Sequence, residues 1–459
     1  GAVRMDIPRE NFFKKEINIV ISRSYGPGRY DPSYEEKGND YPLSYVRFTE
    51  QRNMETFLSL LSQKKLDLKN LITHRFTLDE AATAYQLIEG KKTEPYLGIL
   101  LSYNSKTFDK NSSDLIKINP TKVDNDKIKI SFYGAGNYAT ATLIPLMKDS
   151  GKVSFNGLVT STGMSAQSVA KKFDFNYCAS NYKEILNDKN DVVAITTRHD
   201  THSKAICDAL AANKNVYVEK PLALSISELE DINKAYTDNA KSQIMVGFNR
   251  RFAPATNEII QHFESVKSPL VINIRVNAGF IPADHWTQDA QEGGGRMIGE
   301  GCHFIDLASA ITKSNVKTIY AVGSSKEEKS ALLNDNLCLS LTFENGSIAN
   351  ITYTADGSKA MSKEHIEVFG GGRSAQIKDF KEISLFDGDK KVKDKKLGSQ
   401  DKGQKLMIDS WLKGIQNGEP CIDYNSLMQT SLATILSIES LSIGMPLDVD
   451  SKLYKIKSS

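Results

Sequence analysis

The run at 134–139, Gly-Ala-Gly-Asn-Tyr-Ala, has residue types that can seat a dinucleotide, and it directly follows an apolar stretch at 128–133. Gly134 permits a tight turn, Gly136 lets the backbone approach a phosphate because it has no Cβ, and Ala139 lets a helix pack closely on a strand. The amides that open the following helix would bind a pyrophosphate. This strand–turn–helix context predicts a dinucleotide site, although such a turn often needs glycine for structural reasons alone.

Hydroxyl side chains stand where the adenosine ribose of the dinucleotide would bind. In NAD sites an Asp or Glu about twenty residues after the glycines usually binds the ribose 2′-hydroxyl. Here the next predicted strand ends at Thr160 and Ser161, with no acid within reach. A carboxylate would repel a 2′-phosphate and a hydroxyl would not. The sequence therefore slightly favours NADP over NAD, although no arginine stands beside the strand to bind a 2′-phosphate.

Two further polar segments follow predicted strands, and one of them contains a lysine with catalytic potential. Lys220 comes directly after Glu219 at the end of the strand 216–218. A lysine in a partly dry cleft has a lowered pKa, and it can polarise or protonate a substrate oxygen. The carboxyl end of a strand favours that function for Lys220 over an ordinary surface lysine.

The other segment contains Thr197, His199 and His202, and it follows the predicted strand at 192–196. It would reach the same edge of the sheet, near a nicotinamide ribose. His202 is equally well explained as a helix-capping or surface histidine.

A triple glycine at 293–295 leads into a segment with Glu300, His303 and Asp306. Glu300 and His303 are three residues apart and share one helical face, so the carboxylate could orient the histidine as a general base. The alternative is a structural histidine paired with Asp306, which is also three residues away. A nucleophilic Cys302 beside His303 is not favoured, because adjacent helical residues do not face each other.

Composition restricts the class of protein. The 459 residues are 40% hydrophobic and 25% charged, which is typical of a globular protein of two or three domains. The net charge of +2 gives no case for nucleic-acid binding, and no apolar run is long enough to span a membrane. The five scattered cysteines lack zinc-site spacing, so we expect no metal, reduced cysteines and a cytoplasmic protein.

The elements that would position these residues fall into four regions: 1–103, a polar linker at 104–126, 127–247 and 248–459. The third region alternates helix signals with strands predicted at 128–133, 153–160, 192–196, 216–218 and 243–248. This alternation predicts a parallel, doubly wound sheet.

The fourth region begins with helices near 254–263 and 300–311. Successive strands are then predicted at 318–322, 336–343, 347–353 and 365–369, with closing helices at 404–416 and 426–442. Strands in succession predict an open, mostly antiparallel sheet. In the first region we expect a helix over 52–66, a capping box at Thr77–Glu80 that opens a helix closed by Gly90, and a strand at 96–101.

Four motifs in order resemble the glucose–fructose oxidoreductase/inositol dehydrogenase (Gfo/Idh/MocA) family. They are the glycine run at 134–139, Glu219-Lys220-Pro221, the segment Gly-Phe-Asn-Arg-Arg-Phe at 247–252, and the triple glycine that leads to His303-Phe304-Ile305-Asp306. The resemblance extends from about residue 127 to the end. It implies a Rossmann domain followed by an α/β domain, whose open sheet covers the active site with one face and often forms an oligomer interface with the other.

The resemblance also implies NAD(P)-dependent oxidation or reduction at a hydroxyl group of a sugar or cyclitol. The family's lysine falls on Lys220 and its histidine on His303. Its usual aspartate, four residues before the histidine, falls on Gly299. Glu300, one position later, either takes over that role or the acid role is lost.

Residues 1–103 resemble the C-terminal part of a medium-chain alcohol-dehydrogenase-like domain, through the segments 24–32 and 72–76. The whole chain then resembles a two-enzyme fusion of the kind associated with bacterial surface-polysaccharide synthesis, cut inside its first enzyme. We expect this first segment to have no independent activity.

The expected reaction is hydride transfer between a nicotinamide and a hydroxyl or keto group of a sugar, nucleotide sugar or cyclitol. The catalytic residues expected are Lys220, His303 and Glu300. The cofactor contacts expected are Gly134, Gly136, Asn137, Tyr138, Ala139, Thr160, Ser161, Thr197, His199, His202, Glu219, Lys220 and Asn249. The substrate contacts expected are Lys220, Arg251, Asn277, His285, Trp286 and His303, of which Trp286 is equally well explained as a core residue.

Two alternatives remain open. One is a non-catalytic NAD(P)-binding sensor of the same fold, favoured by the displaced acid at Glu300. The other is an enzyme that depends on the missing first one. The resemblance further implies a homo-oligomer, a dimer or tetramer, formed through the C-terminal sheet.

Overall fold

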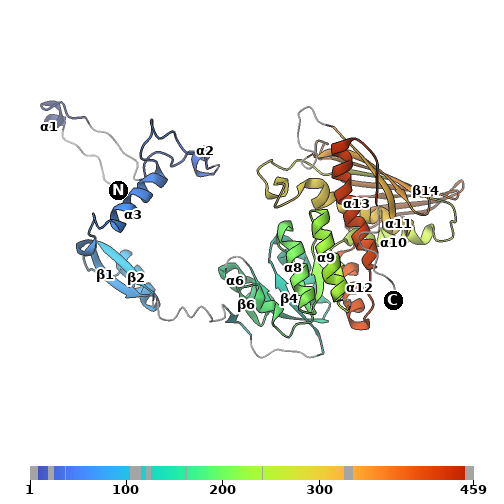
Figure 1. The fold of residues 1–459 in the computed structure, drawn as a ribbon, viewed down its shortest axis with the longest axis horizontal. Coiled ribbons are helices and arrows are strands. Elements are labelled where there is room, and N and C mark those ends of the chain that lie inside the picture. Colours follow the sequence, from blue (N-terminus) through green and yellow to red (C-terminus); the bar gives the residue numbers. More distant parts are fainter. Residues whose placement is uncertain are drawn as a thin grey trace. The chain divides into compact units, whose positions relative to one another are not determined.

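The computed structural model of the chain describes residues 9–18, 25–36, 38–103, 115–119, 126–160, 163–239, 241–324 and 334–449 (Figure 1). The chain divides into two compact units, Gly1–Ser112 and Ser113–Ser459. Among the described residues, no helix is long and apolar enough to cross a membrane.

The first unit is small and exposes many of its apolar side chains. Its elements are α1 (Arg9–Phe13), α2 (Pro32–Glu35), α3 (Glu50–Ser62), β1 (Ile72–Thr77), α4 (Ala81–Ile88) and β2 (Gly98–Ser102). The predicted capping box at Thr77 and Glu80 is present, and β1 pairs with β2 in parallel. Helix α3 buries no residue, and the buried apolar side chains among the described residues of this unit are Ala84 and Leu87.

The second unit begins with a seven-stranded sheet in the order β3-β6-β5-β4-β7-β8-β9. Its strands are β3 (Ile116–Lys117), β4 (Ile128–Tyr133), β5 (Val153–Val159), β6 (Tyr177–Ala179), β7 (Val192–Ile195), β8 (Asn215–Val218) and β9 (Ile244–Val246). The helices between them are α5 (Ile144–Asp149), α6 (Gly163–Phe173), α7 (Lys183–Leu186), α8 (His202–Ala211) and α9 (Ile226–Asp238).

This sheet confirms the predicted doubly wound architecture. All its strands run parallel except β3, which is antiparallel to β6. The central strands β4 and β7 are almost wholly buried, as expected for a parallel sheet with helices on both faces. The five predicted strands are present, whereas β6 and β3 were not predicted. Strand β3 lies inside the predicted linker at 104–126, so part of that segment belongs to the sheet.

A nine-stranded sheet forms the rest of the second unit, in the order β17-β16-β15-β14-β10-β13-β12-β11-β18. Its strands are β10 (Val271–Asn277), β11 (Val316–Gly323), β12 (Asn336–Phe343), β13 (Ile348–Thr354), β14 (Glu364–Gly370), β15 (Arg373–Lys378), β16 (Glu382–Asp387), β17 (Lys390–Lys396) and β18 (Leu447–Asp448). The helices are α10 (Pro254–His262), α11 (Cys302–Thr312), α12 (Gln404–Asn417) and α13 (Tyr424–Ile443).

The second sheet is mostly antiparallel, as predicted, with one exception among its described strands. Strand β10 pairs with β13 in parallel and with β14 antiparallel. Strands β10, β15, β16, β17 and β18 were not predicted from the sequence. Buried and exposed residues alternate along β12 and β13, so one face of the sheet packs on the core and the other is open.

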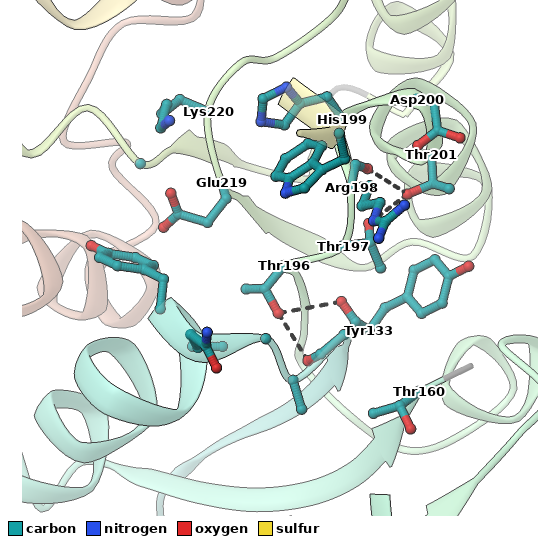
Figure 2. Close-up of a pocket in the computed structure, with 18 of the residues that line it drawn as sticks. Tyr133, Thr160, Thr196, Thr197, Arg198, His199, Asp200, Thr201, Glu219 and Lys220 are labelled. Atoms are coloured by element: carbon teal, nitrogen blue, oxygen red, sulfur yellow. Dashed lines mark hydrogen bonds between the residues drawn. The ribbon is translucent and has the colours of Figure 1, made fainter. Parts of the chain in front are cut away.

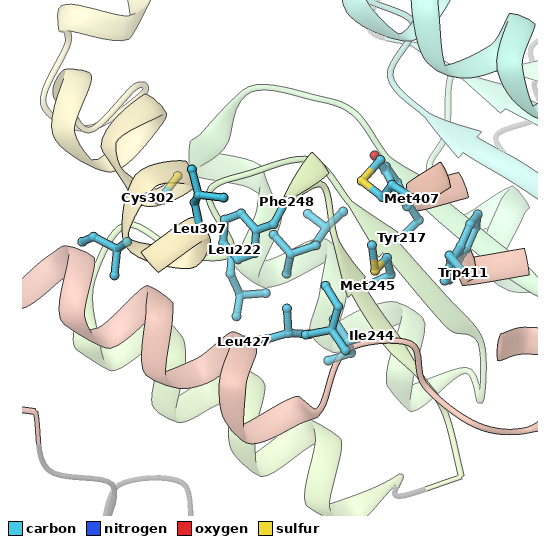
Figure 3. Close-up of a cluster of buried hydrophobic side chains, with 14 of the residues drawn as sticks. Tyr217, Leu222, Ile244, Met245, Phe248, Cys302, Leu307, Met407, Trp411 and Leu427 are labelled. Atoms are coloured by element: carbon cyan, nitrogen blue, oxygen red, sulfur yellow. The ribbon is translucent and has the colours of Figure 1, made fainter. Parts of the chain in front are cut away.

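One apolar core joins the two sheets of the second unit. Figure 3 shows Tyr217 and Met245 from the first sheet beside Trp411 of α12, and Leu307 and Leu427 from α11 and α13 nearby. The ring centroids of Tyr217 and Trp411 are 5.1 Å apart. Helices α12 and α13 therefore pack directly on the seven-stranded sheet, and one core connects the two sheets.

Candidate active site

A pocket of about 1170 Å³ lies at the carboxyl edge of the seven-stranded sheet. Its walls include residues that follow β4, β5, β6, β7, β8 and β9 in the chain. Strand β4 pairs with β5 on one side and β7 on the other, so the pocket occupies the point where the strand order reverses, which is where open α/β sheets bind ligands. The second sheet's domain contributes Trp286, Glu292, His303, Lys402 and Gln404.

The glycine turn after β4 forms one wall of the pocket. Gly134 has a φ of +98°, and a Cβ on it would lie 2.6 Å from the Thr196 carbonyl oxygen, so only glycine fits. The Thr196 hydroxyl donates to the Gly134 carbonyl at 2.9 Å, which ties the turn to β7 (Figure 2). A Cβ at Gly136 would meet no described atom within 4 Å, and Ala139 is buried against the core. The turn thus leaves its backbone open on the side where a phosphate would approach.

The far end of the glycine-turn wall is lined by hydroxyls. Thr160, which follows β5, lines the pocket, and so do Ser180 and Tyr182 after β6. Figure 2 shows Thr160 on the opposite side of the pocket from Lys220. The described lining residues after β5 and β6 include no carboxylate, in agreement with the sequence. The predicted contact Ser161 lies outside the described residues.

Lys220 and Glu219 enter the pocket from the end of β8 (Figure 2). Lys220 Nζ donates a hydrogen bond to the backbone carbonyl of Gly299. Glu219 accepts a hydrogen bond of 2.7 Å from the Tyr217 hydroxyl. Burial raises the pKa of Glu219, although Tyr217 and the Lys220 ammonium act in the opposite direction. Lys220 therefore binds a neutral backbone carbonyl at position 299, where the resemblance stated above implied an aspartate.

His303, at the start of α11, lines the same pocket and is 6% exposed. Its Nδ1 is buried and has no hydrogen-bond partner among the described residues. Burial lowers the pKa of His303 well below its usual value, and the nearby cations Arg250 and Lys220 lower it further. The imidazole is therefore neutral near pH 7.

Glu300 does not pair with His303, which corrects the expectation from helical spacing. Its carboxylate accepts hydrogen bonds from the Tyr353 hydroxyl and from Lys363 Nζ, each at 2.6 Å, and from Arg296 at 3.2 Å. Burial alone would raise the pKa of Glu300, but Lys363 and these hydrogen bonds outweigh it and hold that pKa well below the usual range. Tyr353 on β13 and Lys363 before β14 bind Glu300 in place of the histidine on the same helical face.

The alternative pairing of His303 with Asp306 is also absent. Asp306 is fully buried and accepts a hydrogen bond of 2.9 Å from Arg251 Nε. Arg251 was predicted to contact substrate, but its side chain is 13% exposed and is not among the lining residues. The pair is structural and holds α11 against the segment that follows β9.

His199 and His202 have different positions. His199 lines the pocket, its Nδ1–H donates to the Gly293 carbonyl at 2.7 Å, and the Trp286 ring packs edge-on at 4.8 Å. Burial first, and then the Lys220 ammonium, lower the pKa of His199 to about 3. His202 is fully buried and bonded to the Pro221 and Thr197 carbonyls, outside the lining set, so it is neither a surface nor a pocket residue.

Some of the remaining predicted contacts line the pocket, and others lie away from it. Asn137, Tyr138, Thr197, Asn249 and Trp286 line the pocket. Asn277 and His285 are not among the lining residues: the Asn277 amide donates to the Ser358 carbonyl at 2.8 Å, and His285 is exposed. Their chain position beside the family motifs suggested proximity that the fold does not provide.

Two cations in the pocket, Arg250 and Lys402, were not predicted. Both bind the fully buried carboxylate of Glu364: Arg250 through Nε at 3.0 Å and Nη2 at 2.8 Å, and Lys402 through Nζ at 2.6 Å. Arg250 could have been found in the segment 247–252, but Lys402 lies in a polar stretch before α12 that carries no motif. Only the fold brings Lys402 to the pocket.

Comparison with known proteins accounts for this arrangement. A family model described as "Oxidoreductase family, NAD-binding Rossmann fold" (GFO_IDH_MocA) matches residues 128–248, and the model of the GFO/IDH/MocA C-terminal domain matches residues 268–375. The chain belongs to the Gfo/Idh/MocA oxidoreductase family. The two matches fall on the two sheets of the second unit. The resemblance of residues 1–103 to a medium-chain dehydrogenase stays a prediction.

Individual relatives agree with the family. The Bacillus subtilis oxidoreductase YrbE is 25% identical over 303 residues, which cover 62% of this chain and 86% of that protein. The inositol 2-dehydrogenase of Salmonella typhimurium is 32% identical over 144 residues, 30% of this chain and 41% of that protein, so the match spans less than half of that enzyme. A structure of levoglucosan dehydrogenase with NADH and levoglucosan has a TM-score of 0.63 at 18% identity, covers 70% of this chain and 99% of that one, and shares the fold.

Proposed function

We propose that this protein is a dehydrogenase or reductase that transfers a hydride between a nicotinamide and a CH–OH or keto group of a sugar or cyclitol. The observation that carries the proposal is the shared pocket of the Gly134 turn, Lys220 and His303. The inositol 2-dehydrogenase and levoglucosan dehydrogenase relatives support this substrate class.

The residues of the pocket match the parts of such a reaction. The open backbone at Gly134 and Gly136 would hold the pyrophosphate of the cofactor, whose nicotinamide supplies the hydride acceptor or donor. In the oxidative direction, the neutral imidazole of His303 takes the proton of the substrate hydroxyl as the C–H bond breaks. The Lys220 ammonium stabilises the charge that develops on the substrate oxygen. In the reductive direction each proton transfer is reversed.

Glu300 acts in this proposal through Lys220 and makes no direct contact with the substrate. It belongs to the π-helical turn Met297–Gly301, where the Gly299 carbonyl accepts the hydrogen bond from Lys220. The hydrogen bonds of Glu300 to Lys363 and Tyr353 fix that turn. Glu300 is therefore a positioning residue that offsets the absence of the family's aspartate at position 299.

The test is to replace each reacting side chain and separate turnover from cofactor binding. A placed acid or base contributes about 10²–10⁴-fold to rate, so Lys220→Met and His303→Asn should each lower kcat by that factor. NADH affinity, measured by fluorescence titration, should stay within about twofold of wild type, since neither side chain forms the glycine turn. Lys234→Met, an exposed lysine on α9, is the matched control.

Two outcomes would overturn the proposal. Full turnover in both variants would remove Lys220 and His303 from the chemistry. Wild-type protein that binds NADH but turns over no sugar, cyclitol or nucleotide sugar would favour the sensor, for which the glycine at position 299 is the supporting observation.

Three finer features belong to the same proposal. A slight preference for NADP is supported by the hydroxyl of Thr160 at the end of β5. A homo-oligomer through the nine-stranded sheet is supported by its open face, where Val271, Tyr320 and Ile348 are exposed. A role in surface-polysaccharide metabolism rests on the two-enzyme resemblance, and in that case comparison of this chain with the intact fusion would test whether the second enzyme depends on the first.

A further inference from the structure

The pocket has a positive inner end around His303. Arg250 and Lys402 both line it, and they share the single carboxylate of Glu364 beneath the pocket floor. Arg250 is 7% exposed and Lys402 is 17% exposed at the side chain, so solvent screens neither charge well. Two buried cations on one carboxylate leave one positive charge in excess.

Lys220 adds to this excess. Among the described residues, its ammonium donates to the neutral carbonyl of Gly299, and burial disfavours the charged form of the neighbouring Glu219 carboxyl. The other charged lining residues do not compensate it: Arg198 and Glu292 form an ion pair with each other, and Asp200 is exposed. Glu300 already binds Lys363 and Arg296.

Hydrogen-bond donors remain available at the inner end. Arg250 uses Nε and Nη2 on Glu364, and no bond of its Nη1 occurs among the described residues. Lys402 uses one of its three N–H groups on Glu364. Buried donors and excess charge of this kind favour a ligand that brings acceptors and a negative charge.

We propose that the substrate is an anionic sugar, carrying a carboxylate or a phosphate, and that Arg250 and Lys402 bind its negative group beside His303. This inference rests on the proposed function and names the substrate class of the same site. The ion pair supplies affinity and orients the sugar, so that the hydroxyl to be oxidised faces His303 and Lys220. Lys402 is then a specificity-determining residue that no sequence motif marks.

The test compares neutral and anionic ligands on the full chain saturated with NADH. Glucose, glucuronate, glucose 6-phosphate and inorganic phosphate are titrated, with quenching of bound NADH fluorescence as the readout. At least one of the three anions should bind at least about tenfold more tightly than glucose, as expected for a charge-assisted hydrogen bond, and should lose that advantage in high salt. Inorganic phosphate makes the result independent of sugar stereochemistry.

Lys402→Met should weaken anion binding by about 10- to 100-fold and leave glucose binding and NADH binding within about twofold. Lys405→Met removes the same charge from an exposed position on α12 and should change neither. The wild-type salt dependence gives a result even if the Lys402 variant folds poorly.

Several outcomes would overturn the inference. Equal binding of glucose and all anions, or no anion binding at all, would remove the anion site. An equal loss of NADH affinity in Lys402→Met would assign the charge to the cofactor instead. If neutral sugars are turned over and Lys402→Met has no effect, the inference fails while the proposed function stands. Retained turnover in the Lys220 and His303 variants would be the failure of the proposed function.

Discussion

At the glycine turn the pocket is shaped by backbone, whereas at the inner end around His303 it is shaped by charged side chains. Gly134 fits because a Cβ would overlap the backbone of Thr196 and Thr197. The inner end depends on carboxylates shared between cations, as at Glu364. At the first end a Cβ on Gly134 would overlap the backbone, and at the second end loss of the Glu364 carboxylate would leave its cations without a counter-ion. The two ends should therefore respond differently to substitution.

The largest effect should follow removal of the charge at Glu364. Its carboxylate is fully buried between Arg250 and Lys402, so Glu364→Gln would leave two buried cations without their counter-ion. We expect a loss of about 3–5 kcal/mol in the free energy of unfolding, measured by urea denaturation. Glu367→Gln on the same strand, at a side chain 37% exposed, is the control. If Glu364→Gln lowered the free energy of unfolding no more than the control does, the inner end of the pocket would not depend on the shared carboxylate.

The next effect concerns the glycine turn. Gly134→Ala would force a side chain into a φ of +98° with Cβ 2.6 Å from a backbone oxygen, which costs of order 3 kcal/mol in strain and overlap. The turn should open, and NADH affinity should fall by about 100-fold in a fluorescence titration. Gly151→Ala, at a φ of +69° in open space between α5 and β5, imposes a similar backbone strain away from the pocket. If both variants bind NADH equally, the turn is not a cofactor site.

The smallest effect should appear as a dependence of stability on pH. His199 has a pKa of about 3 in the folded state against about 6.5 in the unfolded chain, so the unfolded chain binds more protons between those values. Stability should be unaffected by this group above pH 6.5 and should fall as the pH drops below it, by about 2 kcal/mol at pH 5.

Urea denaturation of the wild type and His199→Gln at pH 7.5 and pH 5 measures that contribution. The variant should lose less stability than the wild type between the two pH values. His285→Gln, at an exposed histidine, is the matched control. Identical pH dependence in wild type and His199→Gln would show that His199 is not held neutral by burial.

The sequence was most informative where a residue type is dictated by the backbone. Gly134, Ala139, Thr197 and Lys220 could be placed because each belongs to a turn that follows a predicted strand of the parallel sheet. The five strands of the first sheet followed from apolar runs between helix signals. Short or polar strands such as β6, β3 and β17 lack such runs, and only their pairing with neighbouring strands identifies them.

The inner end of the pocket was less predictable because its partners come from distant segments. Glu300 lies on the same helical face as His303, but Tyr353 on β13 and Lys363 before β14 bind it more closely. Arg251 was expected at the substrate and pairs with Asp306 instead. Local spacing states which side chains can meet, and it does not state which partner from elsewhere in the fold will compete.

The packing of α12 and α13 has a consequence for biosynthesis of the chain. Trp411 covers Tyr217, the Gln243 amide donates to the Gly414 carbonyl at 3.2 Å, and the rings of Tyr236 and Tyr424 stack at 3.8 Å. The core of the seven-stranded sheet is thus completed by α12 and α13, which are translated about two hundred residues after β8. A ribosome-bound or recombinant fragment that stops near residue 248 would expose Tyr217 and Met245 to solvent. We expect such a fragment to aggregate or to be proteolysed, and not to fold as an independent dinucleotide-binding domain.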